Sequence, residues 1–124
     1  MIRLAFFVGL GGMIGSVLRF LISQWMLKST PGIAPIGTLV VNILGSFLLG
    51  FLFHFVGKMD RSYYVLLTSG FCGGFTTFST FSVENIDLLL TNSISSAILY
   101  ISLSLVLGLA AAGCGWYLGK IYLA

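Results

Sequence analysis

Polar residues divide the sequence into four long apolar stretches that are joined by short connectors. A helix that crosses about 30 Å of hydrocarbon needs roughly 20 mostly apolar residues. All four stretches reach this length, so the pattern predicts four membrane-spanning helices in a single domain of residues 1–124. The expected spans are approximately residues 2–27, 36–57, 62–90 and 93–123.

The connectors and the span ends have the residues expected at a membrane surface. The first connector, residues 28–35, holds both prolines, the second covers residues 58–61, and the third is a turn near Thr91 and Asn92. Amphipathic aromatic rings favour the membrane–water interface. Those that fall near the predicted span ends are Trp25, Tyr63, Tyr64, Trp116, Tyr117 and Tyr122.

The third stretch departs from a plain apolar helix, because a Gly-Gly pair precedes five hydroxyl residues within residues 76–82. The stretch is longer than one straight crossing requires, and a helix is interrupted at least cost at glycine. We therefore predict a break around Gly73 to Thr76, followed by a helix on which Phe78 and Phe81 share a face. Irregular backbone persists in a membrane only where protein buries it or it lines a wet cavity. This region is the predicted functional centre.

Composition assigns the class of protein. The 124 residues are 58% hydrophobic and 7% charged, and the mean hydropathy is +1.10. Soluble domains carry about a quarter charged residues, so this is an all-helical integral membrane protein. The net charge of +3 comes from six Lys and Arg spread along the chain. They form no basic patch, so nucleic-acid binding is not expected.

Uncharged polar residues inside the spans are candidates for function. Asn42 is an amide among Val, Ile and Leu, and it must face protein or a polar pathway because lipid would leave it unsatisfied. An interhelical hydrogen bond explains Asn42 as well as a pathway does. Tyr100 and Ser104 are four residues apart and share a helical face. They line a polar track or are ordinary membrane-helix residues.

Two charged residues are also open to more than one interpretation. Arg19 lies in the first span, where it would snorkel to the interface, serve as a buried structural partner, or attract an anion at a pore entrance. Glu84 follows Phe81 by three residues. It either faces a vestibule that solvates it or is a water-exposed acid near a helix end.

The chain has little that would support an enzyme. The only histidine, His54, lies in a different span from the hydroxyl cluster and has no positioned acid, and Cys72 and Cys114 match no metal spacing. The polar groups within the spans are mainly hydroxyls, one amide and the positive edges of phenyl rings, which suit a small hydrated anion. Burying such an ion costs tens of kcal/mol, whereas each hydrogen bond to a charge returns about 1.5–3 kcal/mol. Several donors along the path are therefore required.

Three motifs together resemble the small fluoride-channel family, Fluc, also called CrcB. They are GGMIGSVLRF at residues 11–20, GTLVVNILG at residues 37–45 and GFCGGFTTFSTFS at residues 70–82, the most specific of the three. With the four-span length, the resemblance covers the whole chain. It implies passive, selective fluoride export across the inner membrane of a bacterium, by a homodimer of two oppositely oriented subunits.

The resemblance also implies roles for individual residues. The amide of Asn42 would donate a hydrogen bond to fluoride, and Phe78 and Phe81 would turn their ring edges toward the ion. Gly73 and Thr76 of each subunit would hold a structural sodium ion (Na⁺) through their backbone carbonyls at the two-fold axis. The remaining residues that the resemblance places along the fluoride pathway and its vestibules are Ser79, Thr80, Tyr100, Ser104, Arg19 and Glu84.

Charge and function class leave alternatives to this interpretation. Arg3, Lys58, Arg61 and Lys120 fall on the N-terminal side of the membrane against Lys28 and Arg19. This bias favours an inside N-terminus, so the antiparallel dimer rests on the resemblance. A small multidrug exporter of similar length would need a carboxylate deep in the membrane, which the first span lacks. An accessory membrane subunit would leave Asn42 and the hydroxyl cluster without a purpose.

Overall fold

The structure is a computed structural model that describes residues 1–32, 35–91 and 93–124. Residues 33–34 of the first predicted connector and Asn92 of the third lie outside the described residues. Every regular element in the described part of the chain is helical. In order, the elements are α1 (Ile2–Ser29), α2 (Ile36–Leu52), the 3₁₀ turn η1 (Phe53–Phe55), α3 (Arg61–Val65), the π-helical η2 (Leu66–Cys72), α4 (Gly73–Phe75), α5 (Phe78–Leu90) and α6 (Ile94–Tyr122).

Three helical stretches are long and apolar enough to cross a membrane. They are Ile2–Ser29, Ile36–Phe55 and Ile94–Tyr122, and they match the first, second and fourth predicted spans to within two residues at each end. The prediction of an all-helical membrane protein is therefore confirmed. The third predicted span is divided between the run from α3 to α4 and the shorter α5.

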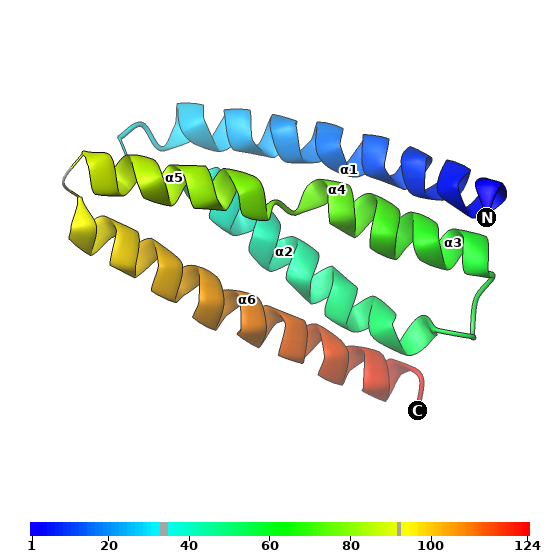
Figure 1. The fold of residues 1–124 in the computed structure, drawn as a ribbon. Coiled ribbons are helices and arrows are strands. Elements are labelled where there is room, and N and C mark those ends of the chain that lie inside the picture. The colour runs from blue at the N-terminus through cyan, green and yellow to red at the C-terminus, as the bar shows by residue number, and fades with distance from the viewer. Residues whose placement is uncertain (33–34, 92) are drawn as a thin grey trace.

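The long helices run alternately back and forth, and the two termini lie at the same end (Figure 1). α2 packs along α6, while α1 packs on η2 and α4. α5 makes most of its contacts with α6 and few with α2. Among the described residues, one side of α5 is therefore left without a packing partner.

Glycines bring α1 to backbone contact with η2 and α4. A Cβ atom added at Gly11 would overlap the carbonyl oxygen of Leu66, and one at Gly15 would overlap that of Phe71. Across the interface, a Cβ on Gly74 would lie 2.9 Å from Ser16 Oγ. Small residues allow this close approach between membrane helices.

The interruption of the third stretch lies at the C-terminal edge of the predicted range. Gly73 is helical, with φ −63° and ψ −38°, and Gly74 continues α4. The extended residues are Thr76 (φ −94°, ψ 158°) and Thr77 (φ −152°, ψ 120°). The Gly-Gly pair is thus not the break, because Gly74 is needed for packing on α1. The β-branched threonines, which favour extended backbone, take that conformation instead.

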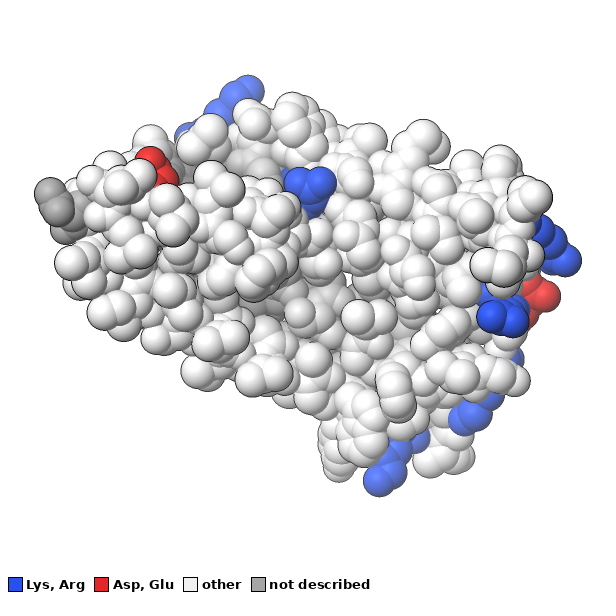
Figure 2. Space-filling view, viewed as in Figure 1, with Lys and Arg blue, Asp and Glu red and all other residues white. Residues whose placement is uncertain are grey.

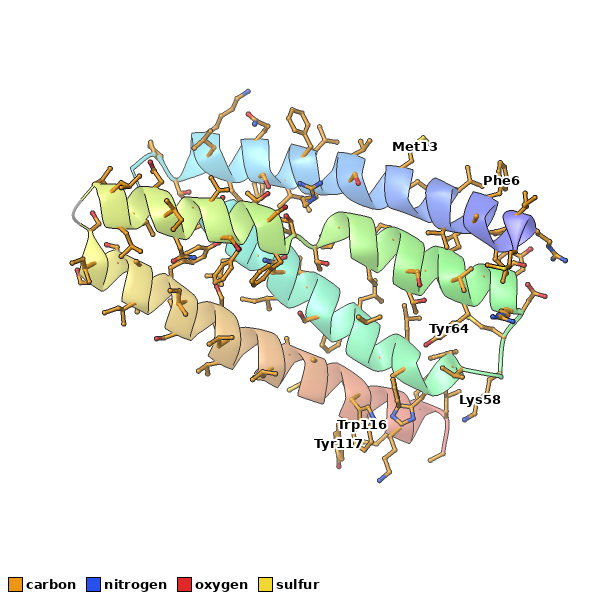
Figure 3. The ribbon with its side chains drawn as sticks, in the orientation of Figure 1. Phe6, Met13, Lys58, Tyr64, Trp116 and Tyr117 are labelled. Carbon is orange, nitrogen blue, oxygen red and sulfur yellow. The ribbon has the colours of Figure 1, made fainter. Side chains whose placement is uncertain are left out.

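The distribution of side chains fits a bilayer. Lys, Arg, Asp and Glu gather at the two ends of the molecule, with one basic group in the middle of the visible face (Figure 2). Phe6 and Met13 point away from the neighbouring helices, and Trp116 and Tyr117 lie near the C-terminal end of α6 (Figure 3). Phe6 is 64% exposed, as expected for a residue that faces lipid.

Candidate functional site

An open groove of about 540 Å³ lies beside the break, between α2, η2, α5 and α6. It brings together four residues of the predicted pathway, Asn42, Phe78, Phe81 and Ser104, from three of the predicted spans. Both predicted carbonyl residues, Gly73 and Thr76, also line it. The other lining residues are Gly45, Ser46, Leu49, Thr68, Ser69, Cys72, Thr77, Leu105 and Gly108.

Asn42 holds the backbone of the break from α2. Its Nδ2 donates to the carbonyl oxygen of Thr77 at 3.0 Å, and its Oδ1 accepts from the N–H of Thr77 at 2.8 Å. These two bonds satisfy backbone groups that lost their helical partners. A carboxamide carries two N–H donors, so one of them is still available on the groove wall. The interhelical bond is therefore made, and it leaves a donor for a ligand.

The two phenylalanines share a face, as predicted, but they differ in burial. Their ring centroids are 5.8 Å apart, with 39° between the ring planes. Phe81 packs on Tyr100, with centroids 5.1 Å apart, whereas Phe78 is 79% exposed. Phe81 is thus held within the chain, and Phe78 projects from it.

The first turn of α5 carries exposed hydroxyl groups. Thr77 Oγ1 lies 3.1 Å from Thr80 Oγ1 and 3.3 Å from Ser79 Oγ, and it accepts from the Thr80 N–H at 3.2 Å. The other N–H groups in the first turn of a helix have no intrahelical acceptor. Together with the helix dipole, they make this end of α5 electropositive. The predicted residues Ser79 and Thr80 are exposed beside it.

Tyr100 and Ser104 do not form one continuous track. The Ser104 hydroxyl is buried on the groove wall and has no hydrogen-bond partner within the described residues. The Tyr100 hydroxyl instead donates to Glu84 Oε2 at 2.8 Å. Ser104 is therefore an unsatisfied donor, whereas Tyr100 is already paired.

Glu84 is a half-buried carboxylate rather than a simply solvated one. Tyr100 donates to one of its oxygens, and Thr38 Oγ1 donates to the other at 2.7 Å. Glu84 and Thr38 line a second pocket of about 180 Å³, beside Ser23 and Gln24 of α1. Sequence reasoning missed Thr38. The signal was present, since Thr38 precedes Asn42 by four residues and shares its helical face.

The Arg19 side chain faces the broken segment. Its Nε donates to the carbonyl oxygen of Gly74 at 2.9 Å, and Ser16 Oγ lies 3.5 Å from the same oxygen. The side chain is half-buried. Of the three interpretations of Arg19, the contacts favour the structural partner.

The carbonyls at the end of α4 divide into paired and unpaired groups. A helix end frees its last carbonyls. Here Gly74 is paired with Arg19, and Thr77 beyond the break is paired with Asn42. Within the described ranges, no donor reaches the carbonyl of Gly73, Phe75 or Thr76. These oxygens, which include both predicted carbonyls, are available for another ligand.

Comparison with known proteins identifies similar sequences. The family model for "CrcB-like protein, Camphor Resistance (CrcB)" matches residues 6–116. A protein of Flavobacterium psychrophilum named "Fluoride-specific ion channel FluC" is 46% identical over 118 residues, which are 93% of this chain and 95% of that protein. A protein of the same name from Azobacteroides pseudotrichonymphae is 40% identical over 125 residues, covering 98% of this chain and 100% of the relative.

Proposed function

Because this chain belongs to the CrcB-like protein family, we propose that it is a fluoride-specific ion channel that exports fluoride passively. The observation that carries this function is the 40–46% identity, over nearly the whole chain, with proteins that bear that name. The resemblance inferred from the three sequence motifs is thereby confirmed, as is the prediction that the protein is not an enzyme. No contact among the described residues favours a multidrug exporter or an accessory subunit.

The groove supplies the donors that a dehydrated anion requires. The free N–H of Asn42, the unpaired hydroxyl of Ser104 and the electropositive first turn of α5 all lie at one groove. Each hydrogen bond to a charged group contributes about 1.5–3 kcal/mol. Several of them in sequence would offset much of the cost of removing fluoride from water. Phe78 and Phe81 would add the positive edges of their rings.

The remaining pathway residues would act at the ends of this groove. Glu84 already holds the hydroxyls of Thr38 and Tyr100. Tyr100 would therefore join the pathway only by exchanging the carboxylate for the ion. Exposed Ser79 and Thr80 would extend the line of hydroxyls along the first turn of α5. Arg19 would lie at the side of the vestibule, with its Nε on the break.

Exposed polar groups in the middle of the molecule support a dimer. Gly73, Ser79 and Thr80 are exposed next to Phe78, which is 79% exposed. Hydrocarbon would leave the hydroxyl and backbone groups unsatisfied. A second copy in the opposite orientation would cover them and complete each groove. The assembly would then be an antiparallel homodimer with two fluoride pores.

The free carbonyls fit a structural sodium ion. Hard cations bind oxygen ligands, and a two-fold axis through this region would bring together the Gly73 and Thr76 carbonyls of both subunits. When bound, Na⁺ would neutralise the negative ends of two interrupted helices. The described residues hold no cluster of three or more His, Cys, Asp or Glu that would favour a transition metal.

The architecture fits four crossings of a bacterial inner membrane. Three helices are long enough to span, and the tandem of α3, η2, α4 and α5 runs beside them over a similar length (Figure 1). Both termini lie at the same end, as an even number of crossings requires. We count the tandem as the fourth crossing.

Ion efflux from liposomes tests the function directly. The purified protein is reconstituted, and fluoride and chloride electrodes follow efflux in parallel while a potassium ionophore clamps the voltage. We expect rapid fluoride efflux without chloride efflux. A folded, reconstituted protein that released no fluoride, or released both ions equally, would contradict the assignment.

A further inference from the structure

Arg19 contacts the break through one particular nitrogen. The Nε atom donates to the Gly74 carbonyl at 2.9 Å, while no Asp or Glu in the described ranges forms an ion pair with the guanidinium. The helical run from Arg61 to Phe75 ends one residue after Gly74, and a cation is favoured near the negative end of a helix. The hydrogen bond to the backbone of the break therefore fixes the orientation of the Arg19 side chain.

This contact determines which carbonyls stay free. Three consecutive helical residues, Gly73 to Phe75, precede the extended Thr76 and Thr77. Arg19 takes the Gly74 oxygen, before the extended residues, and Asn42 takes the Thr77 oxygen at their end; within the described ranges the carbonyls of Gly73, Phe75 and Thr76 have no partner. α1 and α2 thus hold the break from both sides.

We propose that Arg19 is a positioning residue, which holds the end of α4 through the bond from Nε to the Gly74 carbonyl and so keeps the Gly73 and Thr76 carbonyls oriented for ligand binding. Its main contribution is this bond and not long-range attraction of anions. The proposal deepens the proposed function, because it explains how the carbonyls of the break are kept in place.

Three substitutions separate the bond from the charge. In Arg19→Gln, the Nε2 donor is the same number of bonds from Cα as the Arg Nε, but the charge is lost. Arg19→Met has the same reach with neither donor nor charge, and Arg19→Lys keeps the charge with its donor one atom further out. Lys28→Gln is the matched control, since it removes one charge from an exposed position at the end of α1.

Thiol labelling reads out the break without relying on transport or sodium. Cys72 is 2% exposed, and its carbonyl accepts from the N–H and hydroxyl of Thr76. In a Cys114→Ser background, which removes the exposed thiol, a water-soluble maleimide reports loosening of the break. We expect Arg19→Met to raise the labelling rate of Cys72 at least tenfold, and Arg19→Gln and Lys28→Gln to change it less than threefold.

Fluoride efflux at low and high ionic strength completes the test. We expect Arg19→Gln to retain most of the flux and Arg19→Met to lose most of it, with similar ratios at both ionic strengths. If Arg19→Gln behaved like Arg19→Met while Arg19→Lys retained flux, and the difference shrank with salt, attraction of anions would be the role and the proposal would be wrong. Unchanged Cys72 labelling in Arg19→Met would also overturn it.

The experiments distinguish failure of the channel function from failure of the positioning role of Arg19. If the unsubstituted protein released no fluoride, the proposed channel function would be wrong, whereas the Cys72 labelling pattern would still test the Arg19 contact. Normal fluoride efflux together with equal labelling of all variants would leave the channel intact and remove the positioning role.

Discussion

At the scale of single residues, two polar side chains of the spans, those of Asn42 and Arg19, are bonded to the backbone of the break. Asn42 pairs with both backbone groups of Thr77, and Arg19 pairs with Gly74. Each of these side chains keeps donors in reserve, one N–H on Asn42 and the terminal nitrogens on Arg19. In the proposed channel, structural and functional roles would therefore be combined in the same residues.

Asn42→Asp is expected to abolish fluoride flux. The carboxylate would lose the bond to the Thr77 carbonyl, which Nδ2 makes at 3.0 Å, and would repel the anion. Two like charges 4 Å apart repel by about 4 kcal/mol at an effective dielectric of 20, which corresponds to roughly a thousandfold in rate. Efflux from liposomes measures the change, with gel filtration to show that the proposed dimer persists. Normal flux through a folded dimer would contradict the role of Asn42.

Phe78→Ile and Phe81→Ile should both lower the flux while assembly is preserved, because isoleucine has no positive ring edge. Phe81→Ile should lower the stability of the subunit more than Phe78→Ile does. Phe81 contacts Tyr100 at a centroid distance of 5.1 Å, whereas Phe78 is 79% exposed in the single chain. Efflux rates and thermal unfolding together make the comparison. Unchanged flux in both variants would mean that the rings serve only in packing.

At the scale of elements, backbone contact between helices is what holds the broken segment in place. α1 packs on η2 and α4 through Gly11, Gly15 and Gly74. Similar contacts join α6 to α2, where a Cβ on Gly115 would overlap the carbonyl of Phe47. α5 has fewer neighbours inside the chain. The face proposed to line the pore is thus on the helix that has the fewest packing contacts within the subunit.

Gly15→Ala should destabilise the subunit by about 1–3 kcal/mol, the usual cost of overpacking. The added methyl group would overlap the carbonyl oxygen of Phe71 and lie 2.9 Å from the N–H nitrogen of Phe75. Gly9→Ala is the matched control, because nothing lies within 4 Å of its Cβ position. There the better helix propensity of alanine predicts a small gain, at most about 1 kcal/mol.

Unfolding in detergent, followed by tryptophan fluorescence, compares the two variants with the parent protein. Equal stability of Gly15→Ala and Gly9→Ala would show that α1 and the broken segment are further apart than the structure places them. A loss confined to Gly15→Ala would support the close contact.

At the scale of the whole molecule, charge is distributed unevenly between the two ends (Figure 2). Arg3 lies 4.0 Å from Asp60, at the end that also carries Lys58 (Figure 3). Arg61 and Lys120 fall on the same side of the membrane as these residues, whereas Lys28 falls on the opposite side. Because Arg19 is tied to Gly74, it adds little to that other side. The positive-inside rule then favours cytoplasmic termini.

We expect most chains to insert with both termini in the cytoplasm, so the rarer orientation should limit the yield of antiparallel dimer. The double substitution Lys58→Gln and Arg61→Gln should make the fractions of chains in the two orientations more equal and raise the dimer yield. A Met59→Cys label in a Cys114→Ser background, probed from outside cells with an impermeant maleimide, measures the fraction in each orientation. An unchanged fraction after the double substitution would contradict the charge argument.

Much of this protein follows from the sequence alone. The apolar stretches determined the membrane class and three of the spans, because a bilayer requires long apolar helices whatever their packing. The motifs around Gly70 to Ser82 determined the family, which the relatives confirm. The segment predicted as the functional centre lines the groove, and its role stays a prediction.

The tertiary structure decided which groups meet. Thr76 and Thr77, and not the Gly-Gly pair, form the break, because Gly74 has to pack on α1. The contacts that define the site join residues far apart in the chain, with separations of 55 for Arg19 and Gly74, 46 for Thr38 and Glu84, and 35 for Asn42 and Thr77. Such pairs depend on how each helix is rotated about its axis and shifted along it. Local sequence patterns do not contain that information, whereas backbone contact between packed helices sets it.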